Sequence, residues 1–444
     1  MRTEELPKTL VDDPRNGRFQ VSRRVFTEQA ILDQELENIF EGHWIYMAHE
    51  SQLPDAGDFF STYMGRQPVF LVRGKDQKIR AFLNSCAHRG ATVCRTEKGK
   101  QNYFTCPYHG WVYDHEGKNL NIKEVETGGY PESFLKASHD LTPVAKVENY
   151  RGFIFGSLNP DAPPFLEYLG EARTFVDLFA DQSPEGLEVV KGASVYTYRG
   201  NWKLQAENGI DGYHFTTVHA NYVGILQKRI KEAQSKGRAD AVKAAFNEET
   251  ANLNKILNGC YDLGQGHALI WIDFPLPQNR PNWERREEIT QRVGEVRAQW
   301  ILNRQRNLLL FPNVQLMDQA STQIRVFRPL APDLTEVKIY CVGAKGESAE
   351  ARERRIRQYE DFFNATGMAT PDDLAEFEGC AKGYEARTTP VQGYERGMTL
   401  MVRGPDQYAK ALGVNPVASG HDAQDEVLYY GFYRTWANML GLGQ

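Results

Sequence analysis

The chain has 444 residues, of which 41% are hydrophobic and 25% are charged, and its formal net charge is −6. These values are typical of a globular protein with two or three domains, and they exclude a nucleic-acid-binding protein with a strongly basic surface. No apolar run is long enough to span a membrane, the N-terminus does not resemble a signal peptide, and six cysteines do not indicate a disulfide framework. We therefore expect a cytoplasmic protein.

Short helices and strands are predicted in the first part of the chain. Residues 27–41 carry apolar side chains at helical spacing, with Thr27 as a candidate N-cap and Gly42 as a candidate stop. Apolar runs at 69–72 and 79–83 flank a Gly-Lys-Asp-Gln turn, which predicts a hairpin.

Two short pairs of cysteine and histidine follow this hairpin. Cys86 and His88 form a C-x-H pair, and Cys106 and His109 form a C-x-x-H pair. A Rieske [2Fe–2S] cluster is bound by two cysteines on one iron and two histidines on the other. Two loops that each donate one thiolate and one imidazole match this requirement.

A structural zinc site is the alternative for the same four side chains. Zinc motifs pair cysteine with cysteine and histidine with histidine, so the mixed pairs fit zinc poorly. Gly90 and Gly110 follow the two histidines closely, where a tight loop needs backbone freedom. The sequence therefore favours the Rieske cluster, whereas a zinc-stabilised binding module would be colourless.

The remaining chain mixes strands and helices without regular alternation. A Pro-rich segment at 159–164 indicates a domain boundary, and residues 337–341 alternate as in a half-buried strand. Helices are predicted from apolar side chains at 289–300 and at 356–363, the second beginning after Ser348 as N-cap. This arrangement predicts an α+β protein rather than a parallel α/β sheet.

A second candidate metal site contains Asp211, His214 and His219. Non-haem Fe(II) oxygenases bind iron through two histidines and one carboxylate. An i,i+5 pair lies about 140° apart on an ideal helix, so the two imidazoles converge only if the helix is distorted or interrupted. We therefore predict a break or bulge between Tyr213 and His219. Two packed or surface histidines are the alternative, but an upstream one-electron carrier favours an O2-activating iron.

Together the two motifs resemble the large (α) subunit of Rieske non-haem iron ring-hydroxylating oxygenases. The resemblance implies a third iron ligand at the second aspartate of Asp372-Asp373, hence Asp373, with Asp372 in a helix-capping role. It also implies an antiparallel Rieske β domain and a helix-grip-like catalytic domain with an antiparallel sheet and covering helices.

The domains implied by this resemblance follow the chain in order. They are an N-terminal helical segment packed on the catalytic domain, the Rieske domain and the mononuclear iron domain, at residues 1–42, 43–160 and 165–444, respectively.

The resemblance further implies an α3 or α3β3 assembly with a small β subunit. Electrons would pass between neighbouring subunits, with Asp211 as the bridging carboxylate between His109 of one subunit and His214 of the next. The resemblance also implies that NADH supplies the electrons through a separate reductase, with or without a ferredoxin. The chain shows no G-x-G-x-x-G loop between a strand and a helix, which supports such a multicomponent system.

Several stretches, including residues 200–204 and 207–214, are similar to benzoate, toluate and anthranilate 1,2-dioxygenases. This similarity implies an aromatic carboxylate as substrate, with 1,2-cis-dihydroxylation by O2. Anthranilate dioxygenation, salicylate-type monooxygenation and a non-enzymatic Rieske electron-transfer protein are the alternatives.

A substrate carboxylate in an apolar pocket needs a cationic anchor. Arg325 and Arg328 lie three residues apart, hence on opposite faces of a strand. Arg328 shares a face with Ile324 and Val326, so it is the candidate anchor, and a solvated or interface arginine is the alternative.

Overall fold

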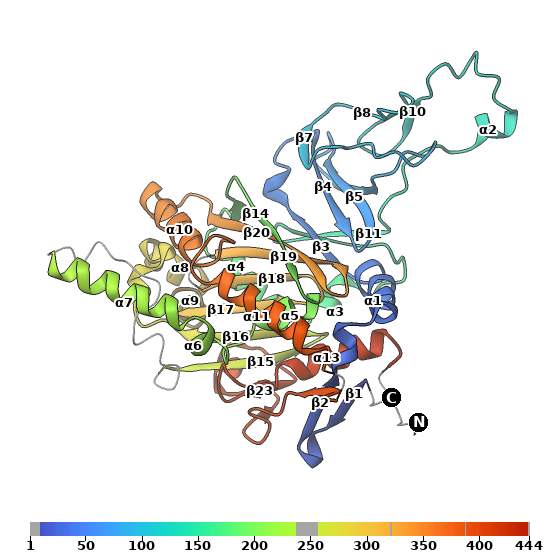
Figure 1. The fold of residues 1–444 in the computed structure, drawn as a ribbon. Helices are drawn as coiled ribbons and strands as arrows, with labels where there is room; N and C mark the ends of the chain where they lie inside the picture. Colours follow the sequence, from blue (N-terminus) through green and yellow to red (C-terminus); the bar gives the residue numbers. More distant parts are fainter. Residues whose placement is uncertain (1–8, 237–255, 320–321, 387, 443–444) are drawn as a thin grey trace, which may run out of the picture. The chain divides into compact units, whose positions relative to one another are not determined.

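The computed structural model describes residues 9–236, 256–319, 322–386 and 388–442 (Figure 1). The chain divides into two compact units, one of residues 36–163 and one that joins residues up to 35 to residues from 164 onwards. The division falls inside the Pro-rich segment 159–164. None of the helices in the described ranges has the length and apolar character to cross a membrane.

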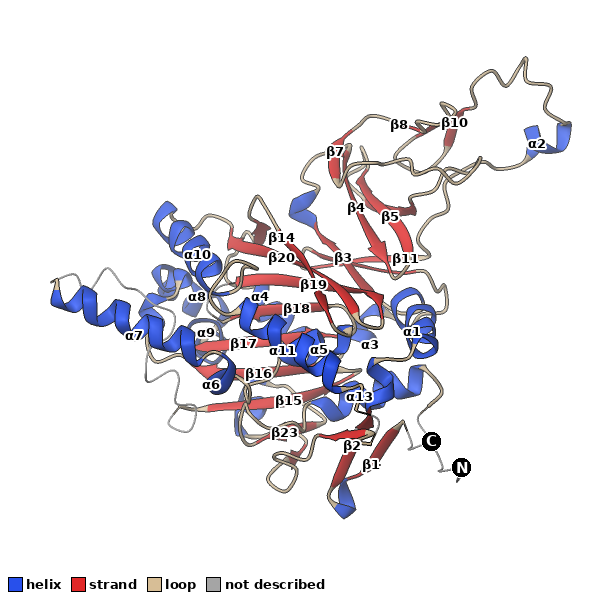
Figure 2. Cartoon of the chain, in the orientation of Figure 1, coloured by secondary structure: helices blue, strands red, loops and turns tan. Residues whose placement is uncertain are grey.

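The unit of residues 36–163 consists of three small antiparallel sheets (Figure 2). Its strands are β3 Ile45–His49, β4 Asp58–Met64, β5 Gln67–Arg73, β6 Ile79–Leu83, β7 Lys98–Lys100, β8 Phe104–Thr105, β9 Val112–Tyr113, β10 Asn119–Asn121, β11 Lys146–Tyr150 and β12 Phe153–Ser157. A short helix, α2, covers Glu132–Lys136. The predicted hairpin is confirmed as β5 and β6, and Gln77 in its turn has a positive φ of 65°.

The larger unit is built on a 10-stranded antiparallel sheet. Its strands in spatial order are β13 Leu187–Val189, β20 Leu334–Ala344, β19 Thr322–Ala331, β18 Val314–Asp318, β17 Arg304–Leu310, β16 His267–Asp273, β15 Asn258–Gly264, β23 Ala418–Gly420 and β22 Val402–Arg403, with β14 Ser194–Arg199 also paired to β20. A separate sheet joins β1 Leu10–Asp13, β2 Arg18–Ser22 and β21 Val391–Gly393. The predicted α+β class with an antiparallel catalytic sheet is confirmed.

Helices cover both faces of this sheet (Figure 2). They are α3 Phe165–Leu169, α4 Ala172–Ala180, α5 Trp202–Asn208, α6 Phe215–Val218, α7 Ala220–Ser235, α8 Arg286–Val293, α9 Glu295–Leu302, α10 Ala349–Phe362, α11 Thr370–Gly383, α12 Gln407–Leu412 and α13 Tyr429–Met439. Gln315 of β18 donates to the carbonyl of Gln205 in α5 on one face. On the opposite face, Arg304 of β17 lies 4.2 Å from the ring centroid of Trp300 in α9.

Two of the predicted helices differ in detail. The helix expected at 289–300 is two helices, α8 and α9, because Gly294 between them has a φ of 80° that interrupts the helix. The helix expected at 27–41 is α1 Gln29–Glu35 followed by a π-helical turn. Thr27 is not the N-cap of α1; it is the C-cap of the preceding 3-10 turn. Ser348 caps α10 as predicted, accepting a hydrogen bond from the Ala351 amide.

A buried carboxylate connects three distant segments of the larger unit. Glu35, at the end of α1, accepts hydrogen bonds of 2.7 Å from the indole of Trp202 and of Trp436, and it pairs with Lys203 at 2.5 Å. The side chains of Glu35 and Lys203 are fully buried. A buried ion pair is costly to break because the remaining charge is left without a partner.

Replacing Glu35 with alanine is expected to lower the free energy of unfolding by about 3–5 kcal/mol, because the ammonium of Lys203 would stay buried without its counter-charge. Chemical denaturation followed by tryptophan fluorescence measures this change. Glu37→Ala, at an exposed position two residues on, is the control. Equal denaturation midpoints for the two variants would contradict the anchoring role.

Candidate metal centres

The four candidate cluster ligands lie on two loops with the same hydrogen-bond pattern. The Gly90 amide donates to the Cys86 carbonyl at 2.9 Å, and the Gly110 amide donates to the Cys106 carbonyl at 2.9 Å. Both glycines have a positive φ, 73° and 75°, which is the kind of backbone freedom that the sequence led us to expect at these positions. The two loops therefore share the same backbone turn after their cysteines.

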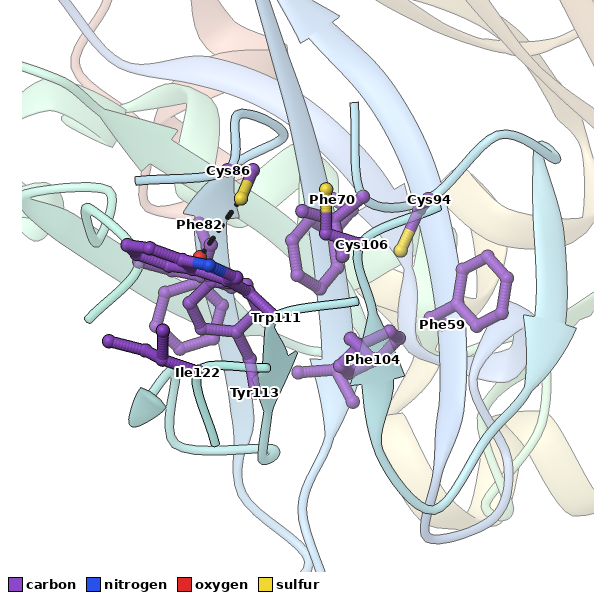
Figure 3. Packing of buried hydrophobic residues seen from close by; sticks show 13 residues of the cluster. Phe59, Phe70, Phe82, Cys86, Cys94, Phe104, Cys106, Trp111, Tyr113 and Ile122 are labelled. Atoms are coloured by element: carbon purple, nitrogen blue, oxygen red, sulfur yellow. Dashed lines mark hydrogen bonds between the residues drawn. The ribbon is translucent and has the colours of Figure 1, made fainter. Parts of the chain in front are cut away.

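Thiols and imidazoles occupy different depths at these loops. Cys86 and Cys106 belong to the buried aromatic core of the smaller unit (Figure 3). His88 is exposed and His109 half-buried, and their Nδ1 atoms face each other at 3.1 Å. Two converging Nδ1 atoms suit a single metal ion, and two neighbouring thiols suit a second one, so the donor set fits a Rieske cluster.

Burial raises the pKa of the Cys86 thiol, and the nearby Cys106 raises it further, whereas a hydrogen bond with Tyr113 opposes the shift. A positively charged metal centre would favour the thiolate form of Cys86 against this shift. The Ala87 amide donates to the Tyr113 hydroxyl at 3.2 Å, which leaves that hydroxyl to donate to Cys86 Sγ at 3.1 Å (Figure 3).

The second candidate centre combines His214, His219 and Asp373, whose ligand atoms all lie within 4.8 Å of one another. The Oδ1 atom of Asp373 lies 3.5 Å from Nε2 of His214 and 3.2 Å from Nε2 of His219. Two imidazoles and one carboxylate converging from one side match the ligand set of non-haem Fe(II) oxygenases. The three side chains therefore fit a mononuclear iron.

The local backbone explains how histidines five residues apart converge. Between them lies a single helical turn, α6, with His214 at its N-cap and His219 at its C-cap. A new helix, α7, begins at Ala220. The predicted break between Tyr213 and His219 is confirmed, and it takes the form of a helix end at His219 and not of a π-bulge. Asp373 comes from the first turn of α11.

Each imidazole has a carboxylate at its other nitrogen. Asp211 Oδ2 lies 3.2 Å from Nδ1 of His214, and Asp372 Oδ2 lies 3.8 Å from Nδ1 of His219. A carboxylate at hydrogen-bond distance fixes the tautomer and orientation of a metal-binding histidine, which applies to Asp211 and not to Asp372 at 3.8 Å. The sequence assigned Asp372 a helix-capping role, which is wrong: the N-cap of α11 is Ala369, no side chain caps the helix, and Asp372 lies in its first turn, behind His219.

Charge around the triad shifts two pKa values. Burial alone would lower the pKa of His214, but the hydrogen bond and charge of Asp211, with the charge of Asp373, raise it overall. Burial alone would raise the pKa of Asp373, but the neighbouring His219, His214 and Arg325 lower it. Asp373 is therefore held as a carboxylate, the form that binds metal.

The triad lies in the wall of a cavity with about 580 Å³ of space between atoms, part of it open to solvent. Apolar, aromatic and polar side chains from several elements surround it, among them Ile270, Ile272, Gln305, Asn307, Met317, Arg325, Phe362 and Phe363. Ile270 and Ile272 of β16, and Gln305 and Asn307 of β17, lie at alternate strand positions. Such alternation in the sequence shows which residues share a face of the strand, but not which face lines the cavity.

The candidate anchor Arg328 is wrong. It is not among the cavity-lining residues, and its Nε lies 3.6 Å from Oε1 of Glu336, its register partner in β20. Arg325 lines the cavity instead. Its register partner in β18 is Gln315, whose side chain contacts α5, so the face of Arg325 is the one that α5 covers.

Asn208 was also missed. Its amide Nδ2 donates to Asp373 Oδ1 at 3.2 Å and lies 3.3 Å from Nε2 of His214. Asn208 belongs to the stretch 207–214 on which the family resemblance rests, so proximity in sequence to Asp211 and His214 was the available signal.

Tyr113→Phe is expected to lower the reduction potential of the cluster by about 20–60 mV, because the lost hydrogen bond, worth about 0.5–1.5 kcal/mol, stabilises the more negative reduced state. A redox titration measures the shift. Tyr63→Phe, at an exposed position in the same unit, is the control. An unchanged potential in Tyr113→Phe would show that the hydroxyl does not act on the cluster.

His219→Ala is expected to lower the iron content from about three to about two per chain while the cluster spectrum stays intact, because only the mononuclear site loses a ligand. Metal analysis with an optical spectrum measures both. His421→Ala, at an exposed histidine of the same unit, should keep all iron. Full iron content in His219→Ala would remove this residue from the ligand set.

Two family models match the chain: a Rieske [2Fe-2S] domain at residues 43–140, and a ring hydroxylating alpha subunit catalytic domain at residues 187–442. The chain is 44% identical to a toluate 1,2-dioxygenase subunit alpha from Pseudomonas putida, covering 97% of this chain and 93% of that protein. It is 44% identical to a 2-halobenzoate 1,2-dioxygenase large subunit from Burkholderia cepacia, with 98% and 92% covered.

An anthranilate 1,2-dioxygenase large subunit from Acinetobacter baylyi is 42% identical, with 96% of this chain and 90% of that protein covered. Among solved structures, naphthalene 1,2-dioxygenase from Rhodococcus sp. bound to indole has a TM-score of 0.81 and 25% identity, covering 95% of this chain and 94% of that chain. The chain therefore belongs to the Rieske non-haem iron ring-hydroxylating oxygenases and is an α subunit of that family.

Proposed function

We propose that this α subunit inserts both atoms of O2 at C1 and C2 of an aromatic carboxylate of the benzoate type, giving a cis-diol. The observation that carries the proposal is the 2-His-1-carboxylate triad in the wall of a cavity with aromatic and apolar sides. The toluate and 2-halobenzoate relatives support this substrate class. Each turnover needs two electrons and two protons beside O2, and the family takes these electrons from NADH through a separate reductase.

The proposal assigns ligands to both centres. The cluster would be held by Cys86, His88, Cys106 and His109, and the mononuclear iron by His214, His219 and Asp373. When bound, the cluster supplies single electrons and the iron supplies open coordination positions for O2 activation.

The protein's own side chains prepare the iron site for its ligand. Asp211 lies 3.2 Å from Nδ1 of His214 and would orient that imidazole, and the Nε2 atoms of His214 and His219 both lie within 3.5 Å of Asp373. The rings of Phe362 and its neighbour Phe363 supply apolar surface to the same cavity.

Anthranilate is the second candidate substrate, since a subunit named for it is nearly as similar as the toluate and 2-halobenzoate subunits. Product analysis with labelled O2 distinguishes dioxygenation from salicylate-type monooxygenation. The alternative of a non-enzymatic electron carrier is not favoured, because the catalytic-domain model matches most of the larger unit.

The proposal includes an assembly. We infer an α3 or α3β3 oligomer in which Asp211 connects His214 to His109 of a neighbouring subunit. Support comes from the partly exposed side chain of Asp211, 29% accessible, which contacts His214 on one side. A reductase, with or without a ferredoxin, would deliver electrons to the cluster. A cytoplasmic location is consistent with six unpaired thiols.

The deciding experiment is NADH-dependent O2 uptake by the metal-loaded enzyme with its reductase, on benzoate, anthranilate and toluene, with product identification. Benzoate-dependent uptake with a cis-diol product is the expected result. Uptake with toluene alone would overturn the substrate class, and a hydroxylated product with one labelled oxygen would indicate monooxygenation.

Asp211→Asn is expected to keep the iron and sulfide content and the cluster spectrum but to lower coupled turnover about 10- to 100-fold, the range for residues that orient metal ligands. Single-turnover reduction of O2 with pre-reduced protein measures the electron transfer step. Asp333→Asn, at an exposed aspartate of the same unit, is the control. Normal coupled turnover in Asp211→Asn would reject the bridging role.

A further inference from the structure

One buried cation in the cavity wall lacks the partner that comparable residues have. The buried arginines of the described residues are Arg280, Arg304, Arg306, Arg325 and Arg355. Four of them pair with carboxylates: Arg280 and Arg306 with Asp318, Arg304 with Asp273, and Arg355 with Glu347. Arg325 is the exception within the part of the chain that the structure describes.

The guanidinium of Arg325 has an N–H group that donates no hydrogen bond to the described residues. Its side chain is 2% exposed, and its Nε is buried without a hydrogen-bond partner among the described residues. The guanidinium carbon lies 5.6 Å from the ring centroid of Phe363, so one face of the planar group rests on an aromatic ring. Burying a guanidinium without a counter-charge is unfavourable, which points to an anion supplied from outside the chain.

The position of Arg325 identifies where that anion would lie. Arg325 faces the same cavity as His214, His219 and Asp373, and it is the one lysine or arginine among the described residues that line it. The amide side chains that line the cavity are neutral, so they are weaker partners for an anion than a guanidinium. The side-chain oxygens of Gln305 and Asn307 are buried acceptors without partners, and they would repel a carboxylate.

We propose that Arg325 binds the carboxylate of the aromatic substrate and is the residue that selects anionic rings. This inference rests on the function proposed above and names the residue that gives it its substrate class. The guanidinium matches a carboxylate with two parallel hydrogen bonds, a geometry that also fixes the plane of the attached ring. A ring held in this way has its carboxyl-bearing carbon fixed relative to the candidate iron triad.

The alternative is that Arg325 only balances the charge of Asp373. The two roles predict different results, because charge balance acts on every substrate whereas an anchor acts on anions alone. Benzoate and benzamide have nearly the same shape and differ in charge, so they separate the two roles.

The experiment compares Arg325→Gln with the natural enzyme, both loaded with iron and cluster. Calorimetric binding and NADH-dependent turnover are measured with benzoate and with benzamide. We expect benzoate affinity and kcat/KM to fall about 10- to 100-fold, the range for a charge-assisted pair. Benzamide should change less than about threefold, and iron content should stay constant.

Two further variants make the outcome decisive. Arg325→Lys keeps the charge but loses the two-pronged geometry, so we expect an intermediate loss for benzoate of about 3- to 10-fold. Arg328→Gln, on the other face of the same strand, is the matched control and should leave both ligands unchanged. Arg325→Lys also tests the proposal if Arg325→Gln does not fold.

An unchanged benzoate affinity in Arg325→Gln would overturn the proposal. Equal losses for benzoate and benzamide, together with lost iron, would assign Arg325 to charge balance instead. If the natural enzyme oxidises neutral arenes and neither binds nor oxidises benzoate, the proposed substrate class fails, and the anchor fails with it. Benzoate turnover by the natural enzyme with equal effects on both ligands in the variants would reject the anchor alone.

Discussion

The buried carboxylate of Glu35 is the interaction on which the geometry of the catalytic unit depends. It holds the first two residues of α5, Trp202 and Lys203, and the C-terminal helix through Trp436. The other end of α5 is Asn208, which contacts Asp373 and precedes the turn that carries His214. A displacement at Glu35 would therefore be transmitted along one rigid helix of about 10 Å to the metal ligands.

Charge organises the site at the far end of that helix. Carboxylates stand behind both imidazoles, and a third carboxylate stands between them, so the triad and its supports are rich in negative charge. A divalent metal neutralises part of this charge when it binds. Arg325 contributes positive charge to the same cavity, where it opposes the negative charge of the carboxylates.

Much of this arrangement was predictable from residue type and spacing. The mixed pairs around Cys86 and Cys106 specified the cluster loops, including the positive φ at both glycines. The i,i+5 separation of His214 and His219 required a helix interruption, because no regular helix brings such a pair together, and α6 ends as required.

What the sequence could not settle depended on tertiary contacts. Alternation places Arg325 and Arg328 on opposite faces of β19, but only the packing of α5 decides which face meets the cavity. Gly294 divided a helix whose apolar spacing looked continuous, because a single left-handed residue outweighs periodicity. Asp372 could not be placed behind His219, since the two are more than a hundred residues apart.

The cysteines of the two cluster loops are buried and the histidines are more exposed, and this difference affects how electrons reach the cluster. Sulfur donors lie inside an aromatic core, whereas the imidazole of His88 is open to solvent. Electron transfer through the buried sulfur side would have to cross several layers of protein, whereas transfer through the imidazole side would not. Any redox partner, whether it loads the cluster or discharges it, gains its shortest path by docking over the same two rings. Reduction of the cluster and its reoxidation would then need the same surface, so the two redox partners would bind in turn and their exchange would limit the rate of turnover.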